Sequence, residues 1–177
     1  LSDHNVMSCN VAKSSCPSES EAEEIQSHLC ETQKPAKLMG IQVDECKKES
    51  LTLSAPLDLN HNVHGTAFAG SLYSVAVLSA YYLGRAWLRR EGEQLSKYVL
   101  VAKAGRIQYR KPVTESRIVA KSFLPSKLSL LKFRDNLLDV GKSSIEIEGH
   151  VIIAENIVAC DFTVELCAYL PREKIVT

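Results

Sequence analysis

The residues from Asn60 to Val75, NHNVHGTAFAGSLYSV, hold the densest cluster of hydrogen-bonding side chains, beside the most apolar segment of the chain. After His64, no charged residue occurs before Arg85. The carboxamide of Asn60 can hold a carbonyl oxygen or orient a water molecule. The imidazole of His64, with an unperturbed pKa of about 6.5, can act as a general base. An Asx turn and a solvated loop would use the same residues, so both interpretations stay open.

The apolar run that follows predicts one long helix from Thr66 to about Arg89. The first N–H groups of a helix have no partner within it and lie at the positive end of its dipole. Gly70 and Ser71 would therefore offer backbone N–H groups to a carbonyl oxygen that gains charge during a reaction. Gly65 and Gly70 let a ligand approach the backbone closely. In the alternative interpretation, Thr66 caps the helix and the glycines only form the turn.

The composition argues against several classes of function. Lys plus Arg and Asp plus Glu both number 21, and no basic stripe with aromatic residues indicates nucleic-acid binding. The six cysteines form no CxxC pair and fit no zinc spacing, so we expect no metal and no intramolecular disulfide, but reduced thiols in a cytoplasmic protein. Polar residues and glycines interrupt the run 66–84, which favours a buried helix over a membrane span.

Alternating apolar and polar residues predict strands on both sides of the long helix. The first two and the last two strands are expected to form hairpins, the last one turning at Glu155 and Asn156. A bulge is expected at Gly105. The order of elements predicts an α+β fold in which an antiparallel sheet of five or six strands wraps around one long central helix. The expected strands are 41–46, 50–57, 98–113, 117–122, 142–154 and 156–170.

Two further helices and a tail complete the expected organisation. A helix over 20–33 is capped by Ser20 and ended by Pro35. Residues 1–20 predict a flexible N-terminal arm, and 21–177 a single domain. The other helix lies within 123–140, and its expected buried positions are Leu128, Leu131 and Leu138.

Three blocks of sequence resemble the hotdog fold, and specifically the thioesterase-like domain family found at the C-terminus of certain bacterial acetyltransferases. They are LMGIQV (38–43), APLDLNHNVHGTAFAGSLYSVAVLSA (55–80) and IQYRKPV (107–113). The resemblance implies an acyl thioester of coenzyme A or acyl carrier protein as the substrate. Coenzyme A or phosphopantetheine would be part of that substrate, with no separate cofactor. It also implies a homodimer or a dimer of dimers, with the site at the subunit interface.

The same resemblance assigns roles to residues near the helix N-terminus. Asn60 matches an Asn that the family has before the helix, and Arg110 and Lys111 could pair with the phosphates of the substrate, although solvated strand-end charges would look the same. Tyr73 could place its hydroxyl in the pocket or bond to backbone. The expected catalytic residues are Asn60, His64, Gly70 and Ser71. The expected substrate-binding residues are Asn62, Gly65, Thr66, Phe68, Tyr73, Arg110 and Lys111.

The chain departs from better-known hotdog thioesterases at two positions. Phe68 stands where many of them have a His, and the helix is apolar near Val77, where they have an Asp or Glu. The resemblance thus implies a thioesterase that lacks the usual carboxylate for activating water. Decarboxylation of a malonyl thioester needs only oxyanion stabilisation and is one alternative. The other is a non-catalytic module for acyl-thioester binding or dimerisation.

Overall fold

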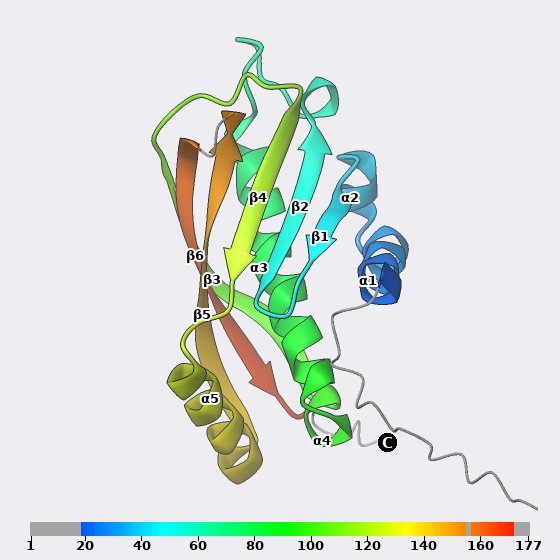
Figure 1. Ribbon diagram of the computed structural model, residues 1–177, viewed down its shortest axis with the longest axis vertical. Helices are drawn as coiled ribbons and strands as arrows, with labels where there is room; N and C mark the ends of the chain where they lie inside the picture. Colours follow the sequence, from blue (N-terminus) through cyan, green and yellow to red (C-terminus); the bar gives the residue numbers. More distant parts are fainter. Residues whose placement is uncertain (1–18, 155–156, 172–177) are drawn as a thin grey trace, which may run out of the picture.

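A six-stranded antiparallel sheet curls around one long helix, α3 (Ala69–Arg90), in the computed structural model (Figure 1). The structure describes residues 19–154 and 157–171, so most of the expected arm and the expected turn at Glu155 and Asn156 lie outside it. In order across the sheet, the strands are β1 (Gln42–Cys46), β2 (Ser50–Pro56), β4 (Arg117–Phe123), β5 (Lys142–Ile153), β6 (Ile157–Tyr169) and β3 (Val99–Tyr109). The other helices are α1 (Glu19–Thr32), α2 (Lys34–Leu38), the 3-10 turn η1 (Leu57–Leu59), α4 (Glu93–Ser96) and α5 (Lys127–Val140). The predicted α+β hotdog architecture and both hairpins are confirmed.

Small side chains on α3 let the helix lie close to the sheet. Ser79 on α3 and Ser122 on β4 are fully buried, and their hydroxyl oxygens are 2.6 Å apart. A Cβ added at Gly84 would lie 2.6 Å from the side chain of Leu166 on β6, closer than van der Waals contact allows. The sheet supplies the larger groups, including Leu53, and each buried leucine contributes about 1.5–3 kcal/mol. The central helix is therefore buried against the sheet, as its sequence predicts.

The start of α3 differs from the prediction. The helix begins at Ala69, three residues after Thr66, and its N-cap is Phe68, which makes no side-chain capping bond. Thr66 cannot cap the helix because it belongs to the preceding loop, where its carbonyl accepts a 2.8 Å hydrogen bond from the Asn62 N–H. The interpretation of Thr66 as the cap is wrong.

The predicted ends of α1 were nearly right, but Pro35 has a different role. α1 begins at Glu19, one residue before Ser20, and ends at Thr32. Pro35 lies in the first turn of α2, where its missing N–H costs no helical hydrogen bond. The proline therefore starts a second short helix as well as separating it from the first.

The buried face of α5 was predicted incorrectly. Leu128 and Leu138 are exposed and Leu131 is only partly buried, whereas Phe133 and Leu137 are buried. The helix packs on β5 through one narrow face, and residues four positions apart lie on the same face. With several leucines in the helix, the periodicity alone did not identify that face.

The bulge in β3 lies between Ala102 and Ala104 instead of at Gly105. Gly105 lies opposite Tyr73 of α3, and an added Cβ there would collide with the tyrosine hydroxyl. The strand ends at Tyr109, and the N–H groups of the next two residues both donate to the carbonyl of Ala159. The absence of a side chain at Gly105 therefore allows Tyr73 of α3 to lie close to β3.

The two edges of the sheet are treated differently. At β1, the side chain of Gln26 on α1 accepts a 2.7 Å hydrogen bond from the Val43 N–H and donates to the carbonyl of Ile41. β3, at the opposite edge, is eleven residues long and largely exposed, and no described element pairs with its outer side. Unpaired edge strands are templates for pairing with another chain.

The remaining expectations concern thiols and membranes. Cys30, Cys46, Cys160 and Cys167 are free thiols, and Cys9 and Cys16 lie outside the described residues. Cys160 and Cys167 are buried in β6. Within the described ranges, no helix is both long and apolar enough to cross a membrane.

Candidate functional site

The loop between η1 and α3 folds as a narrow hairpin. His61 and Ala67 form an antiparallel bridge, and the Phe68 N–H donates to the Asn60 carbonyl at 2.7 Å. The N–H of Ala67 donates to the carbonyl of Val113 at 2.9 Å. The start of α3 is thereby held beside the segment that follows β3.

Asn62 organises the inside of this loop. Its side-chain oxygen accepts hydrogen bonds from the N–H groups of His64 at 2.8 Å and Thr66 at 3.3 Å. Its amide donates to the hydroxyl of Thr66 at 2.9 Å. The contacts of Asn62 and Thr66 are those of an Asx turn, so their primary role is to hold the loop.

Asn60 is buried, with 3% of its surface exposed. Its amide group donates to the carbonyls of Met39 and Pro56, both at 2.8 Å. These two acceptors fix the orientation of the amide, because a flipped group would set oxygen against oxygen. Its oxygen Oδ1 is buried and has no hydrogen-bond partner among the described residues. Asn60 can therefore accept a hydrogen bond from a water or ligand, but it has no N–H left to donate to an oxyanion.

The N-terminus of α3 has no side-chain cap. The first helical hydrogen bond runs from the Leu72 N–H to the Phe68 carbonyl at 3.0 Å. The N–H groups of Ala69, Gly70 and Ser71 have no acceptor among the described residues. The ring of Phe68 folds back over Gly70, where an added Cβ would collide with it. Three backbone donors thus lie together at the positive end of a 22-residue helix.

A cavity of about 290 Å³ opens between this helix end and the end of β3. The Tyr109 hydroxyl donates to the carbonyl of Ala69 at 3.0 Å and so ties the strand to the first residue of the helix. The prediction did not single out Tyr109, although it lies within IQYRKPV. Of the predicted site residues, three come together in this lining, namely Asn62, Arg110 and Lys111.

The charges of the cavity are only partly compensated. Arg110 forms an ion pair with Asp161 on β6, and the hydrogen bond from this guanidinium lowers the pKa of the Asp161 carboxyl. His150 on β5 contacts the other oxygen of the same carboxylate at 3.0 Å. Lys111 has no ion-pair partner among the described residues. The rim therefore carries one unpaired ammonium group beside a paired guanidinium.

The structure does not bring His64 to this cavity. It lies at the exposed tip of the loop, next to Val63, which is 95% exposed. Gly65, with φ of +75°, lines a separate hollow of about 420 Å³ with His61. No carboxylate is hydrogen-bonded to the His64 ring within the described part of the chain. His64 and Gly65 thus have no contact with the helix end in this structure.

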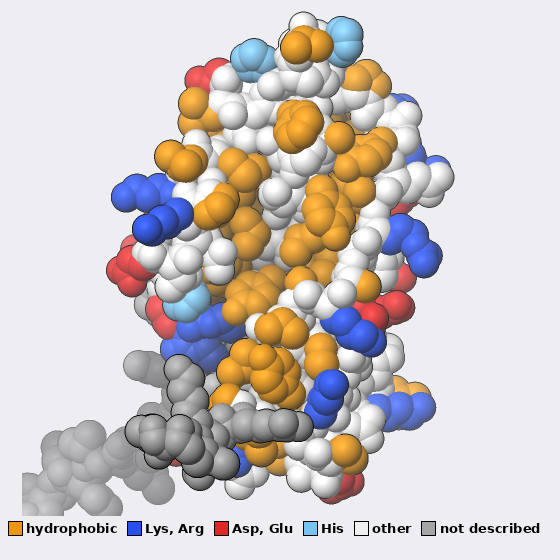
Figure 2. Space-filling view, turned by 180° about the vertical axis from the view of Figure 1, so that it is seen from behind, with side chains coloured by type: hydrophobic (Ala, Val, Ile, Leu, Met, Phe, Trp, Pro, Cys, Tyr) orange, Lys and Arg blue, Asp and Glu red, His pale blue; other side chains and the backbone are white. Residues whose placement is uncertain are grey.

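Exposed apolar side chains lie at the start of α3 and along the whole length of β3, from the site to the far end of the strand. The view from the α3 side shows hydrophobic groups down the middle of this face (Figure 2). Tyr73 is 37% exposed and lies across Gly105. We call these residues the apolar strip: Phe68, Tyr73, Val99, Val101 and Tyr109.

The site offers neither a metal centre nor a helical carboxylate. In the ranges that the structure describes, no group of three or more His, Cys, Asp or Glu side chains could hold a metal ion. α3 contains no Asp or Glu in its 22 residues. The chemistry available is hydrogen bonding from the helix end, an acceptor at Asn60, and positive charge at the rim.

A sheet wrapped around a long helix, with a polar loop leading into an uncapped helix N-terminus, defines the hotdog class of protein. The chain belongs to the family described as "Putative thioesterase (yiiD_Cterm)", which it matches over residues 22–169. Thioesterases act on acyl thioesters, so the family also indicates the general class of substrate.

Solved structures share the fold. A protein of unknown function from Chlorobaculum tepidum is 25% identical with a TM-score of 0.75, over 85% of this chain and 94% of its own. A "putative thioesterase" from Shewanella oneidensis is 24% identical with a TM-score of 0.70, over 87% of this chain and 100% of its own. A thioesterase from Haemophilus influenzae is 13% identical with a TM-score of 0.67, over 86% of this chain and 94% of its own.

Proposed function

We propose that this protein hydrolyses acyl thioesters of coenzyme A or of carrier-protein phosphopantetheine at the N-terminus of α3. The observation that carries the proposal is the group of three N–H donors at residues 69–71, which have no acceptor among the described residues. Membership of a thioesterase family supports the reaction class. We place the reacting carbonyl at the helix end.

The reaction needs an oxyanion hole and a positioned water. Water attacks the thioester carbonyl, and the N–H groups of Gly70 and Ser71 stabilise the oxygen as it becomes negative. We assign the orienting of the attacking water to Asn60 Oδ1, which is buried in this structure and must become accessible when the substrate binds. The attack forms the C–O bond and a tetrahedral intermediate, which then collapses with cleavage of the C–S bond, and a proton of the water passes through solvent to the leaving thiolate. A thiolate is a good leaving group, which reduces the need for an acid to protonate it.

The rim supplies the recognition of the leaving group. Lys111 has no ion-pair partner in the described structure, and Arg110 is held in place by Asp161. The guanidinium and the ammonium group can both bind phosphate oxygens. We assign them to the phosphates of coenzyme A or of phosphopantetheine. The apolar strip would then receive the acyl chain.

We also propose that a second copy of this chain pairs along β3. The strand is long, its outer edge is unpaired, and Val99 and Val101 expose apolar surface. An exposed hydrophobic patch of this kind marks an interaction surface. In the homodimer, the apolar strip would be covered, and the cavity at the helix end would gain its second wall.

One observation favours a second candidate reaction. Because α3 lacks any carboxylate, the site is suited to reactions that need only oxyanion stabilisation. In decarboxylation of a malonyl thioester, the bond to the carboxylate breaks, carbon dioxide leaves, and the electron pair forms an enolate that the same N–H groups would stabilise. A non-catalytic acyl-thioester module remains the alternative if neither reaction occurs.

A panel of acyl-CoA substrates, including malonyl-CoA, distinguishes these functions. Hydrolysis releases a free thiol, whereas decarboxylation yields acetyl-CoA, which mass spectrometry identifies. Gly70→Ala should reduce turnover because the new methyl group displaces the ring of Phe68 at the donors. Ser71→Ala keeps its backbone N–H and should retain most of the activity. The assignment would be contradicted if Ser71→Ala lost its activity while Gly70→Ala kept full activity.

A further inference from the structure

A second cavity of about 640 Å³ lies at the other end of α3. It is enclosed by the C-terminal turns of α3, the turn between β1 and β2, and the first turns of α5. Trp87, which lines it, is 18 residues from Ala69, or about 27 Å along the helix axis. The two cavities share no lining residue. This site is therefore separate from the proposed thioester site.

The inner wall of this second cavity is apolar. The ring of Trp87 packs against that of Phe133 on α5, with ring centroids 5.7 Å apart. The N–H of Leu124 donates to the carbonyl of Glu49 at 2.9 Å, which closes the wall between the β4–α5 connection and the β1–β2 turn. The apolar lining residues are Trp87, Leu124, Pro125, Leu130 and Leu131.

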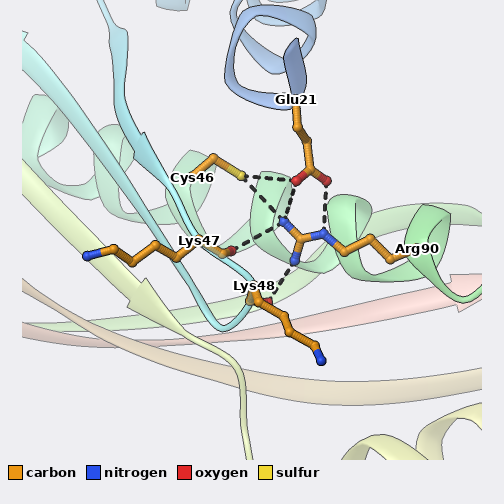
Figure 3. A network of polar contacts seen from close by, with 5 residues as sticks. All are labelled: Glu21, Cys46, Lys47, Lys48 and Arg90. Atoms are coloured by element: carbon orange, nitrogen blue, oxygen red, sulfur yellow. Dashed lines mark hydrogen bonds and ion pairs between the residues drawn. The ribbon is translucent and has the colours of Figure 1, made fainter. Parts of the chain in front are cut away.

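Two arginines of the rim are already engaged. Arg90 forms a bidentate ion pair with Glu21, at 2.9 and 2.7 Å, and donates to the carbonyls of Lys47 and Lys48 (Figure 3). Arg134 pairs with Asp135 at 3.1 Å. Arg90 therefore fixes the backbone of the β1–β2 turn. Both arginines are already paired with carboxylates, so neither is available as an unpaired positive charge for a ligand.

The lining also holds two carboxylates: Glu91 lies 4.0 Å from Arg134, and Glu49 has no ion-pair partner among the described residues. Two lysines of the lining are cations without a partner. Lys48 and Lys127 both line the cavity, and neither has an ion-pair partner among the described residues. The side chain of Lys48 extends away from the Arg90 network, while its own carbonyl is held by Arg90 (Figure 3). An apolar wall beside two unpaired lysines, which outnumber the one unpaired carboxylate of Glu49, is complementary to an anion that carries an apolar chain.

The geometry points to a binding site here for a fatty-acid anion. The hydrocarbon chain lies along Trp87, Leu130 and Leu131, and the carboxylate lies at Lys48 and Lys127. Charge complementarity selects the anion, and the apolar wall selects a chain over a small polar acid. The site binds its ligand whether or not the helix end is catalytic, so the two proposals are tested separately.

Titration with decanoate tests the site, because Trp87 is the only tryptophan in the chain and reports from its wall. We expect a saturable change in tryptophan fluorescence below the micellar concentration. Because each lysine would contribute one exposed ion pair with the carboxylate, Lys48→Ala/Lys127→Ala should weaken binding roughly twofold to thirtyfold. Leu131→Gln should also weaken it. Leu131 is outside the buried core, which keeps the fold intact.

The matched control is Lys34→Ala/Lys37→Ala, which removes two exposed positive charges far from this cavity and should leave the titration unchanged. Decanol and decylammonium should bind more weakly than decanoate. Equal binding of decanol, an unchanged lysine double variant, or the absence of a saturable signal would overturn the proposal. Tighter binding of decyl phosphate than of decanoate would overturn the choice of carboxylate.

Discussion

The side chain of Asn60 donates a 2.8 Å hydrogen bond to the carbonyl of Met39, 21 positions earlier in the chain. Its second amide hydrogen goes to Pro56 at the same distance. The amide thus joins the end of α2 to the end of β2, and only Oδ1 is left for chemistry. The residue that the sequence ranks first for catalysis has a structural role as well.

This structural role changes the outcome expected from Asn60→Ala. The sequence alone predicts lost turnover with intact folding, whereas the structure predicts that both suffer. Two buried carbonyls would lose their donors, which should lower the free energy of unfolding by roughly 2–4 kcal/mol. Turnover should fall on the order of 10²-fold, measured at a temperature where circular dichroism shows the variant folded. Thr66→Val, which removes only a hydrogen bond within the loop, is the control, and near-normal turnover in Asn60→Ala would refute the catalytic role.

The close approach of Tyr73 to Gly105 predicts a coupled pair of substitutions. Gly105→Ala should destabilise the protein by about 1–3 kcal/mol, because the added methyl group collides with the tyrosine hydroxyl. In a Tyr73→Ala background, the same change should cost much less. Urea denaturation of the four proteins of this double-mutant cycle measures the coupling. Equal costs in both backgrounds would mean that the two residues do not constrain each other.

Pairing along β3 predicts the effect of charge on that strand. Val101→Glu should convert a dimer into a monomer, because it places a carboxylate in the apolar strip. Sedimentation at micromolar concentration measures the change. Val63→Glu, at the exposed loop tip, is the matched control and should remain dimeric. If the unmodified protein sediments as a monomer, the proposal of a homodimer fails.

Burial of two thiols predicts slow alkylation. Burial raises the pKa of Cys46 to about 11 and that of Cys160 to about 11, so both are protonated near neutral pH. Because the thiolate is the nucleophile, iodoacetamide at pH 8 should modify them slowly in the folded protein and quickly in denaturant. Mass spectrometry of peptides gives the rate at each site. Rapid modification of native Cys160 would show that β6 is more accessible than its contacts indicate.

The ion pair of Asp161 predicts a loss of stability in acid. Its pKa is lowered in the folded state, mainly by the hydrogen bond from Arg110. The ionised carboxylate therefore stabilises the fold above the ordinary aspartate pKa of about 3.9, and this contribution disappears as the pH falls below that value. Urea midpoints measured from pH 6 to pH 3 should fall less steeply in Asp161→Asn. The side chain is one-third exposed, so the effect should be small.

The sequence predicted the helices and strands whose apolar residues recur at a regular spacing or whose ends are marked by proline, glycine or polar residues. The charge-free run identified α3, and alternating residues identified the strands, because burial of one face imposes those patterns. It failed where several residues could serve equally well. Leu128 and Phe133 both suit an apolar helix face, and only packing on β5 selects Phe133.

The candidate site was predictable in its location but not in its contacts. The crowding of polar groups before α3 indicated the loop that the structure places beside the uncapped end of this helix. Hydrogen bonds between distant segments, such as that from Tyr109 to Ala69, leave no local pattern and could not be predicted. His64 has the right side chain for catalysis, but the loop hairpin places it at an exposed tip.

The hydrogen bonds of Gln26 at β1 also affect how far association can proceed. A sheet with two open edges can add subunits without limit, as fibres do. Here Gln26 of α1 engages two backbone groups at the β1 edge, so β3 is the edge strand that is left open among the described residues. Pairing of two identical edges consumes both and produces a closed, two-fold object. A larger assembly would then form through faces of the sheet or through helices, because the chain's own first helix opposes growth by strand addition at β1.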